Sequence, residues 1–87
     1  METKNILITG GLGFIGSNYV RHIYHNYDYN IHNVDLKTYA ADYDNIGNEI
    51  KNSDRYTLSI CDINDTTRIK RLVHKQNINY IVNFAAE

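Results

Sequence analysis

Four glycines near the amino terminus have the spacing of a phosphate-binding turn. They form two overlapping patterns, Gly11-x-Gly13-x-x-Gly16 and Gly10-x-x-Gly13-x-x-Gly16. A chain that turns tightly from a strand into a helix needs backbone angles that are open mainly to glycine. A pyrophosphate can approach such a turn where no Cβ intervenes, and the free N–H groups of the helix that follows attract it. The glycines therefore predict a pyrophosphate site.

An acidic residue, Asp35, stands where a dinucleotide-binding turn requires one, at the end of the next predicted strand. Its carboxylate can accept hydrogen bonds from both hydroxyls of an adenosine ribose and would repel a 2′-phosphate. NAD is therefore preferred over NADP, and the neighbouring Lys37 softens that preference. A glycine turn without a ligand is the competing interpretation. The strand before the turn, the helix after it and Asp35 all disfavour it.

Two further segments follow predicted strands. Asp62 and Ile63 would lie beside the adenine pocket, although Asp62 could instead only cap the next helix. Phe84, Ala85 and Ala86 close the last strand, where small residues leave room for a ligand at the point at which the strand order reverses. Packing in the core is the alternative for these three residues.

Hydrophobic periodicity gives the elements that must position these residues. The continuous apolar run at residues 5–9 predicts a strand buried on both faces. Ile15, Tyr19, Ile23 and Tyr27 recur every fourth residue and predict one face of a helix. Further strands are predicted at residues 31–36, 56–60 and 80–84, with one or two helical turns near residues 45–51.

The third predicted strand and the second long helix show clear patterns of their own. Tyr56, Leu58 and Ile60 alternate with polar residues, which is typical of an outer strand with one buried face. Asn64 or Asp65 can cap a helix whose apolar positions fall at i, i+3 and i+4, and which residues 76–77 can end. The apolar positions of this helix are Ile69, Leu72 and Val73.

The order of the elements, β-α-β-loop-β-α-β, implies parallel strands joined by right-handed crossovers. We expect an α/β fold, the N-terminal half of a Rossmann-type doubly wound parallel sheet with the strand order 3-2-1-4. With 87 residues, the chain is predicted to be one incomplete NAD-binding segment, residues 1–87, without a substrate-binding part.

Composition argues against several other classes of protein. Nine Lys and Arg against ten Asp and Glu provide no overall attraction for nucleic acid or anionic membrane. Residues 1–4 do not begin a signal peptide, and no apolar run approaches the roughly 18–20 residues of a membrane helix. Cys61 is the only cysteine, so no internal disulfide can form. We expect a soluble, cytoplasmic protein.

Two side-chain constellations are discounted as sites. His22 and His25 share part of a helix surface but lack the glutamate of a helical zinc motif, so we expect no metal site. Arg68, Arg71 and Lys75 form a basic stripe without interleaved aromatic residues, which favours a solvated helix face over a nucleic-acid site.

Four blocks of sequence resemble the N-terminal part of the extended short-chain dehydrogenase/reductase family, and within it the nucleotide-sugar 4,6-dehydratases. The blocks are residues 8–18, 35–40, 62–63 and 83–87, and residues 38–40 carry the narrower dehydratase-like signal. The chain departs from the usual family order at Leu36 and Lys37, which have exchanged places, and at residues 41–42.

The resemblance implies an NAD cofactor, a nucleotide-sugar substrate (dTDP- or UDP-glucose) and a homo-oligomeric parent enzyme. Family members oxidise the sugar at C4, eliminate water across C5–C6 and return the hydride to C6, with catalytic residues that lie downstream of this segment. The resemblance also implies which residues approach the cofactor: Phe14 and Ile15 the pyrophosphate; Asp35, Leu36, Lys37 and Thr38 the adenosine; Asp62 and Ile63 the adenine; and Phe84, Ala85, Ala86 and Glu87 the nicotinamide half.

Two other functions stay open from the sequence. A nucleotide-sugar 4-epimerase of the same family shares the first and last blocks. A non-catalytic nucleotide-binding module is the alternative if 87 residues make up the whole protein.

Overall fold

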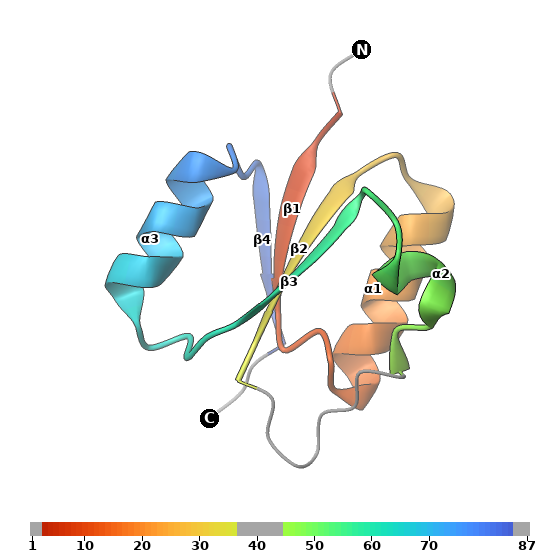
Figure 1. Cartoon of the computed structure of the whole chain (residues 1–87), viewed down its shortest axis with the longest axis horizontal. Coiled ribbons are helices and arrows are strands. Elements are labelled where there is room, and N and C mark those ends of the chain that lie inside the picture. Colours follow the sequence, from red (N-terminus) through yellow and green to blue (C-terminus); the bar gives the residue numbers. More distant parts are fainter. Residues whose placement is uncertain (1–2, 37–44, 85–87) are drawn as a thin grey trace.

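The computed structural model describes residues 3–36 and 45–84. Within them a parallel sheet lies between two layers of helix (Figure 1). The elements are β1 (Asn5–Thr9), α1 (Phe14–Asn26), β2 (Asn30–Asp35), α2 (Asn48–Lys51), β3 (Tyr56–Ile60), α3 (Thr66–Lys75) and β4 (Tyr80–Asn83). The strands pair in the order β3-β2-β1-β4, and every pair is parallel. The predicted α/β class and strand order 3-2-1-4 are therefore confirmed.

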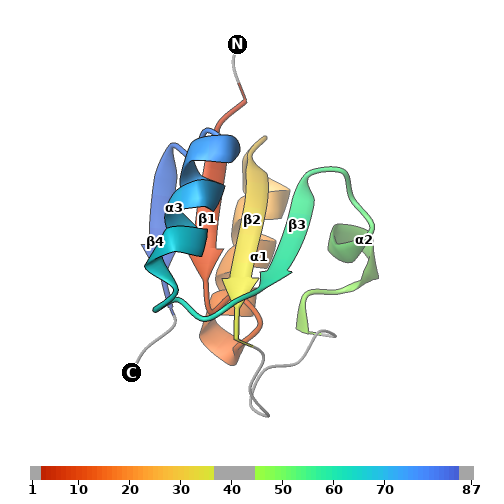
Figure 2. The same cartoon turned by 60° about the vertical axis from the view of Figure 1, so that its left-hand side comes forward.

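Helices α1 and α2 cover one face of the sheet and α3 covers the other (Figures 1 and 2). β1 is buried on both faces, as predicted, because Ile6 and Ile8 pack on the α1 side and Leu7 packs on the α3 side. The α1 side holds the larger buried cluster: Ile6, Ile8, Leu12, Val20, Ile23, Ile31, Ile46 and Ile50. On the α3 side the fully buried residues are Leu7, Val34 and Cys61, and no residue of α3 itself is fully buried.

Two faces predicted from hydrophobic periodicity are buried only in part. The buried stripe of α1 runs through Val20 and Ile23, whereas Ile15 is 68% exposed and Tyr27 is 49% exposed. Ile15 lies in the first turn of α1, directly after the glycine-rich connection, and Tyr27 lies beyond the last helical residue. Ile60 is also exposed, because it is the last residue of β3 at the edge of the sheet.

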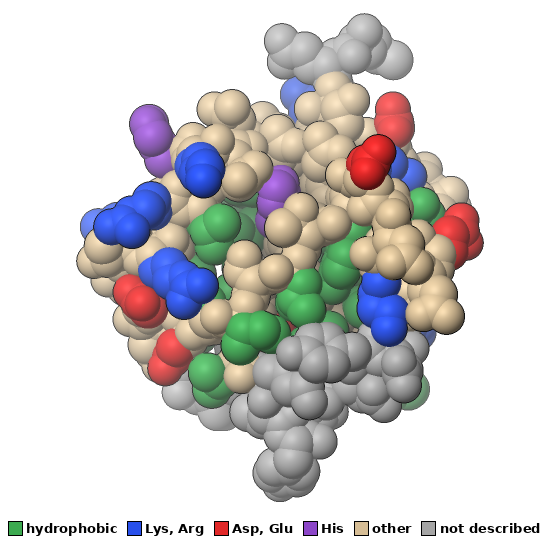
Figure 3. Space-filling model, in the orientation of Figure 1, with side chains coloured by type: hydrophobic (Ala, Val, Ile, Leu, Met, Phe, Trp, Pro, Cys, Tyr) green, Lys and Arg blue, Asp and Glu red, His purple; other side chains and the backbone are tan. Residues whose placement is uncertain are grey.

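Helix α3 begins and ends as the sequence predicted. Of the two candidate caps, Asp65 is the one used, since its carboxylate accepts a hydrogen bond from the Arg68 N–H at 3.2 Å. Asn77 follows the helix with a φ of 53°, in the left-handed region that Asn tolerates. Ile69, Leu72 and Val73 pack against the buried residues of the α3 side, and Lys and Arg side chains gather over this helix on the face seen in Figure 3.

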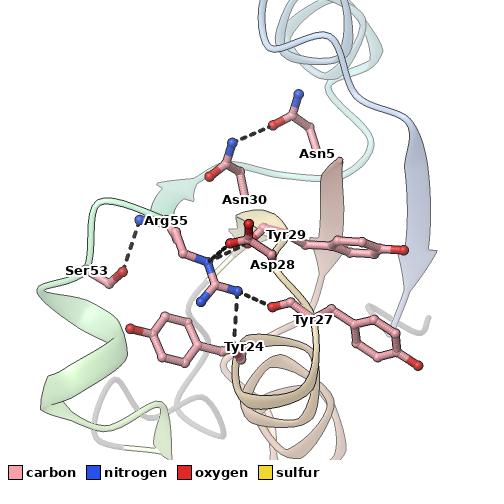
Figure 4. A network of polar contacts seen from close by, with 8 residues as sticks. All are labelled: Asn5, Tyr24, Tyr27, Asp28, Tyr29, Asn30, Ser53 and Arg55. Carbon is pink, nitrogen blue, oxygen red and sulfur yellow. Dashed lines mark hydrogen bonds and ion pairs between the residues drawn. The ribbon is translucent and has the colours of Figure 1, made fainter. Parts of the chain in front are cut away.

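Arg55 lies directly before β3 and connects neighbouring segments at the amino end of the sheet through hydrogen bonds (Figure 4). Its guanidinium donates to the backbone carbonyls of Tyr24, Tyr27 and Tyr29, and lies 4.4 Å from the centre of the Tyr24 ring. Asp28 is close enough for an ion pair, at 3.9 Å from Nε. Because Tyr24 belongs to the last turn of α1, Arg55 also neutralises the negative end of that helix.

Candidate functional site

The glycine turn (residues 10–13) connects β1 to α1 at the carboxyl end of the sheet (Figure 1). Gly10 has a φ of 73°, a conformation that favours glycine, and its carbonyl accepts the Gly13 N–H at 3.2 Å. The first hydrogen bond of α1 joins the Ser17 N–H to the Gly13 carbonyl at 2.8 Å. The predicted strand–turn–helix arrangement is therefore present.

Gly13 and Gly16 are glycines for different reasons. A Cβ on Gly16 would lie 2.1 Å from the Gly10 carbonyl oxygen, so this glycine lets the helix pack against the turn. Among residues 3–36 and 45–84, a Cβ on Gly13 would meet only the Gly10 oxygen, at 3.6 Å, which is an ordinary contact. Gly13 also has an ordinary φ of −71°. Neither the backbone nor the packing of the described residues requires glycine at position 13, so the space that they leave open beside it is available to a ligand.

The start of α1 is well exposed beside that space. The N–H groups of Phe14, Ile15 and Gly16 precede the first hydrogen bond of the helix, so they have no partner within it. The residues Phe14 and Ile15 are 78% and 68% exposed, and Leu36, which follows β2, is 55% exposed. Donors at a positive helix end together with exposed apolar side chains suit a ligand that carries both phosphate and rings.

Asp35 lies at the end of β2, as predicted, and is 8% exposed. Its Oδ2 accepts a hydrogen bond from the Leu12 N–H at 2.9 Å, which fixes the carboxylate beside the glycine turn. The sequence did not predict this hydrogen bond, nor a second one in which the Asn45 side chain donates to the Leu12 carbonyl at 3.1 Å. The period-two placement of polar Asn33 and Asp35 on one strand was the available signal for a polar face beneath the turn.

The other described candidates lie at the carboxyl ends of β3 and β4. Asp62 is exposed and accepts the Asn64 N–H at 2.9 Å, so it shapes the turn before α3 while Asp65 caps the helix. Ile63 is half-buried. Phe84 is half-buried as well, and its ring packs 5.3 Å from the ring of Tyr19 on α1.

Several predicted site residues lie outside the described part of the chain. They are Lys37, Thr38, Ala85, Ala86 and Glu87.

The discounted constellations are exposed. His22 and His25 both face solvent, and across residues 3–36 and 45–84 no three His, Cys, Asp or Glu side chains lie together as metal ligands would. Arg68, Arg71 and Lys75 are exposed on α3. No helix within the described ranges is both long and apolar enough to cross a membrane.

Two open grooves of about 520 and 580 Å³ flank β4, away from the glycine turn. Tyr19, Tyr29 and Tyr80 line the groove on the α1 side, and Ile69 and Val73 line the one on the α3 side. Ile81 of β4 contributes to both. The grooves therefore follow the edge of the sheet at β4.

Comparison with known proteins matches residues 7–87 to the GDP-mannose 4,6-dehydratase family. A dTDP-glucose 4,6-dehydratase from Escherichia coli is 42% identical over 82 residues, which cover 94% of this chain and 22% of that protein. The chain thus spans about a quarter of the length of the curated relatives it matches.

Solved structures support the same relationship. The dTDP-glucose 4,6-dehydratase of Bacillus anthracis, crystallised in complex with NAD, is 36% identical and superimposes with a TM-score of 0.92 over 98% of this chain and 27% of that one. A UDP-N-acetylglucosamine 4-epimerase from Methanobrevibacter ruminantium is 28% identical, with a TM-score of 0.80 over 99% of this chain and 25% of that one.

Proposed function

Because the chain belongs to the GDP-mannose 4,6-dehydratase family, as its resemblance to extended short-chain dehydrogenases/reductases predicted, we propose that residues 1–87 are the NAD-binding N-terminal segment of a nucleotide-sugar 4,6-dehydratase. Its substrate would be dTDP-glucose or UDP-glucose. The identity to dTDP-glucose 4,6-dehydratases and the superposition on an NAD-bound relative support this proposal.

The observation that carries the proposal is the open space beside Gly13. Within the described residues, a Cβ there would make only an ordinary contact on an ordinary backbone conformation, but a side chain would occupy the space in front of the helix N-terminus. A pyrophosphate that approaches the backbone explains why glycine occupies this position. The residues present therefore fit a dinucleotide.

We assign the cofactor contacts along the carboxyl end of the sheet. The N–H groups of Phe14 and Ile15, which precede the first hydrogen bond of α1, would hold the pyrophosphate, and the Asp35 carboxylate would accept the ribose hydroxyls. The remaining contacts are proposed from the family resemblance: Leu36, Lys37 and Thr38 for the adenosine, Asp62 and Ile63 for the adenine, and Phe84, Ala85, Ala86 and Glu87 for the nicotinamide half.

The chemistry that NAD supplies when bound is the reversible acceptance of a hydride, which would oxidise the sugar at C4, permit loss of water across C5–C6 and allow reduction at C6. The role of this segment is to hold and orient the cofactor. We place the catalytic acid, base and sugar-binding residues in the part of a homo-oligomeric parent enzyme that follows this segment.

An assay of the complete protein that contains this segment tests the activity. We expect it to convert dTDP-glucose or UDP-glucose into a 4-keto-6-deoxy product, measured by mass spectrometry. Interconversion of C4 epimers with the C6 hydroxyl retained would instead identify an epimerase. An intact-mass measurement that gives only 87 residues, with no turnover, would favour a non-catalytic nucleotide-binding module.

The isolated segment should behave differently from the complete protein. Tyr80 and Ile81 of β4 are 47% and 56% exposed at the edge of the described sheet, and such edges invite pairing with another chain. We expect the isolated segment to self-associate in sedimentation experiments, to bind NAD weakly and to lack turnover. A stable monomer that dehydrates dTDP-glucose would contradict the assignment of the catalytic residues to a later part of the chain.

A further inference from the structure

A buried asparagine, Asn33, supports the glycine turn from below. Asn33 lies on β2 and is 1% exposed. Its Oδ1 accepts the Gly11 N–H at 3.0 Å, and its Nδ2 donates to the Tyr56 hydroxyl at 3.0 Å. One side chain therefore connects the turn after β1 to the first residue of the edge strand β3.

The fit between Asn33 and Gly11 explains the second glycine of the motif. A Cβ on Gly11 would lie 2.3 Å from Oδ1 and 2.5 Å from Cγ of Asn33, which is closer than any tolerated contact. Gly11 does not have a positive φ, so its backbone conformation alone would accept other residues. Glycine is needed at position 11 because Asn33 occupies the adjoining space.

Asn33 and Asp35 together fix two consecutive N–H groups of the turn. Asn33 accepts from Gly11, and Asp35 accepts from Leu12. The two side chains project from alternate residues of one strand and so lie on the same face of the sheet. Asp35 belongs to the proposed cofactor site, whereas Asn33 is buried beneath it and would act only through the turn.

Tyr56, the hydrogen-bond partner of Asn33 on β3, keeps its hydroxyl proton. Burial raises the pKa of the Tyr56 hydroxyl, an effect that the hydrogen bond from Asn33 opposes and the charge of Asp35 supports. Tyr56 is therefore neutral near pH 7, and its hydroxyl oxygen remains available to accept from Nδ2 of Asn33.

We propose that Asn33 is a positioning residue for the cofactor pyrophosphate, because it holds Gly11 and thereby sets the position of the glycine turn against β2. This inference rests on the proposed function, since it concerns the same dinucleotide site. It adds a residue that touches no ligand. It also distinguishes the two glycines, because Gly11 makes room for the Asn33 side chain and Gly13 makes room for the ligand.

The test compares ligands with and without a pyrophosphate in the complete protein. In the Asn33→Ala variant, we expect NAD and ADP-ribose to bind about tenfold more weakly, the loss of about one buried hydrogen bond. Adenosine, which has no pyrophosphate, should bind with unchanged affinity. Tyr56→Phe is the matched control: it removes the other hydrogen bond of Asn33 and leaves the Gly11 contact, so it should weaken NAD binding less. Isothermal titration calorimetry gives the affinities.

A double-mutant cycle tests the steric half of the argument. Gly11→Ala alone should weaken NAD binding, because the new Cβ displaces Asn33. In the Asn33→Ala background the same substitution should have little further effect, since the colliding side chain is gone. Such strong coupling is expected for residues in direct contact or in one hydrogen-bond network, and not for distant, independent sites.

Three outcomes would overturn the proposal: unchanged NAD affinity in Asn33→Ala, an equal loss of NAD and adenosine affinity, or additive effects in the cycle. If thermal melting shows that Asn33→Ala does not fold, Gly11→Ala decides the matter, because wild-type NAD affinity in that variant also contradicts the proposal. Failure of the unmodified complete protein to bind NAD would refute the proposed function itself and is therefore distinguishable from failure of the role of Asn33.

Discussion

The two ends of the sheet use their polar groups in opposite ways. At the amino end, the Arg55 guanidinium is satisfied by backbone carbonyls of the protein and by the ring of Tyr24 (Figure 4). At the carboxyl end, the N–H groups of Phe14 and Ile15 lie before the first helical hydrogen bond, and both side chains are exposed. Within the described part of the chain, the polar groups of the amino end are satisfied by the protein itself, so this end is closed, while the carboxyl end leaves helix N–H groups open to a ligand.

This difference predicts that the stability of the fold and the affinity for the cofactor depend on different residues. Substitutions at the amino end should alter the free energy of unfolding and leave cofactor affinity unchanged. Substitutions on the open side of the glycine turn should do the reverse. In parallel α/β sheets, ligands bind outside the carboxyl ends of the strands, so the comparison predicts which measurement each variant will change.

Gly13→Val should have the largest effect on binding. The Cβ of the new side chain would make an ordinary contact, since the nearest atom among the described residues is the Gly10 oxygen at 3.6 Å. It would nevertheless occupy the path of the pyrophosphate. Overpacking a close contact costs about 3 kcal/mol, so we expect the NAD affinity of the complete protein to fall about a hundredfold, with little change in the melting temperature. Unchanged NAD titration would show that the glycine turn is not the phosphate site.

Gly16→Ala is the matched control for that variant. Its Cβ would lie 2.1 Å from a backbone oxygen of Gly10, so the start of α1 must shift. We expect this variant to lose thermal stability as well as NAD affinity. If Gly13→Val lowered the melting temperature as much as Gly16→Ala does, the distinction between the two glycines would be wrong.

Asp35→Ala should reduce the preference of the complete protein for NAD over NADP by about tenfold, because the carboxylate that accepts the ribose hydroxyls is lost. The same change also removes the acceptor for the Leu12 N–H. Asp35→Asn separates the two effects, since the amide oxygen can still accept from Leu12 but carries no charge. Equal affinities for the two cofactors in the unmodified protein would refute the role of Asp35.

The sequence was sufficient to predict the strand order and the place of Gly10, Gly13 and Asp35, because these follow from local patterns and from the chirality of parallel connections. It was insufficient for the exposure of Ile15, which shares its predicted helix face with the buried Ile23 but lies in the first turn of α1. The contact between Gly11 and Asn33 was also missed. Periodicity identifies the face on which a side chain lies, but only the fold brings that face beneath the turn.

Arg55→Met tests the closed end of the sheet. The variant loses hydrogen bonds to three backbone carbonyls, and charged donors of this kind contribute about 1.5–3 kcal/mol each in favourable cases. Because Arg55 is partly exposed, we expect a total loss of about 1–3 kcal/mol in the free energy of unfolding by urea, with NAD affinity unchanged. Arg55→Lys should recover only part of this loss, since Lys lacks the planar fork. Lys70→Met on the exposed surface of α3 is the control for charge removal.

His32 gives the smallest expected effect and tests whether the two ends depend on one another. It lies in the middle of β2, paired in register with Leu7 and Thr57, and its Nδ1 is buried without a hydrogen-bond partner among the described residues. Burial lowers the pKa of His32 below its ordinary value of 6.5, so the unfolded chain binds the proton more readily than the folded one. This contribution to stability is fully present above pH 6.5 and decreases as the pH falls through that value towards the folded pKa.

We therefore expect His32→Leu to reduce the difference in melting temperature between pH 7.5 and pH 5.5, roughly one unit on either side of the ordinary pKa of histidine. NAD affinity at pH 7.5, about one unit above that pKa, should stay unchanged, because His32 lies away from the glycine turn. A variant with the full acid sensitivity of the unmodified protein would show that other groups are responsible, and a loss of NAD affinity would show that the middle of the sheet couples its stable end to its binding end.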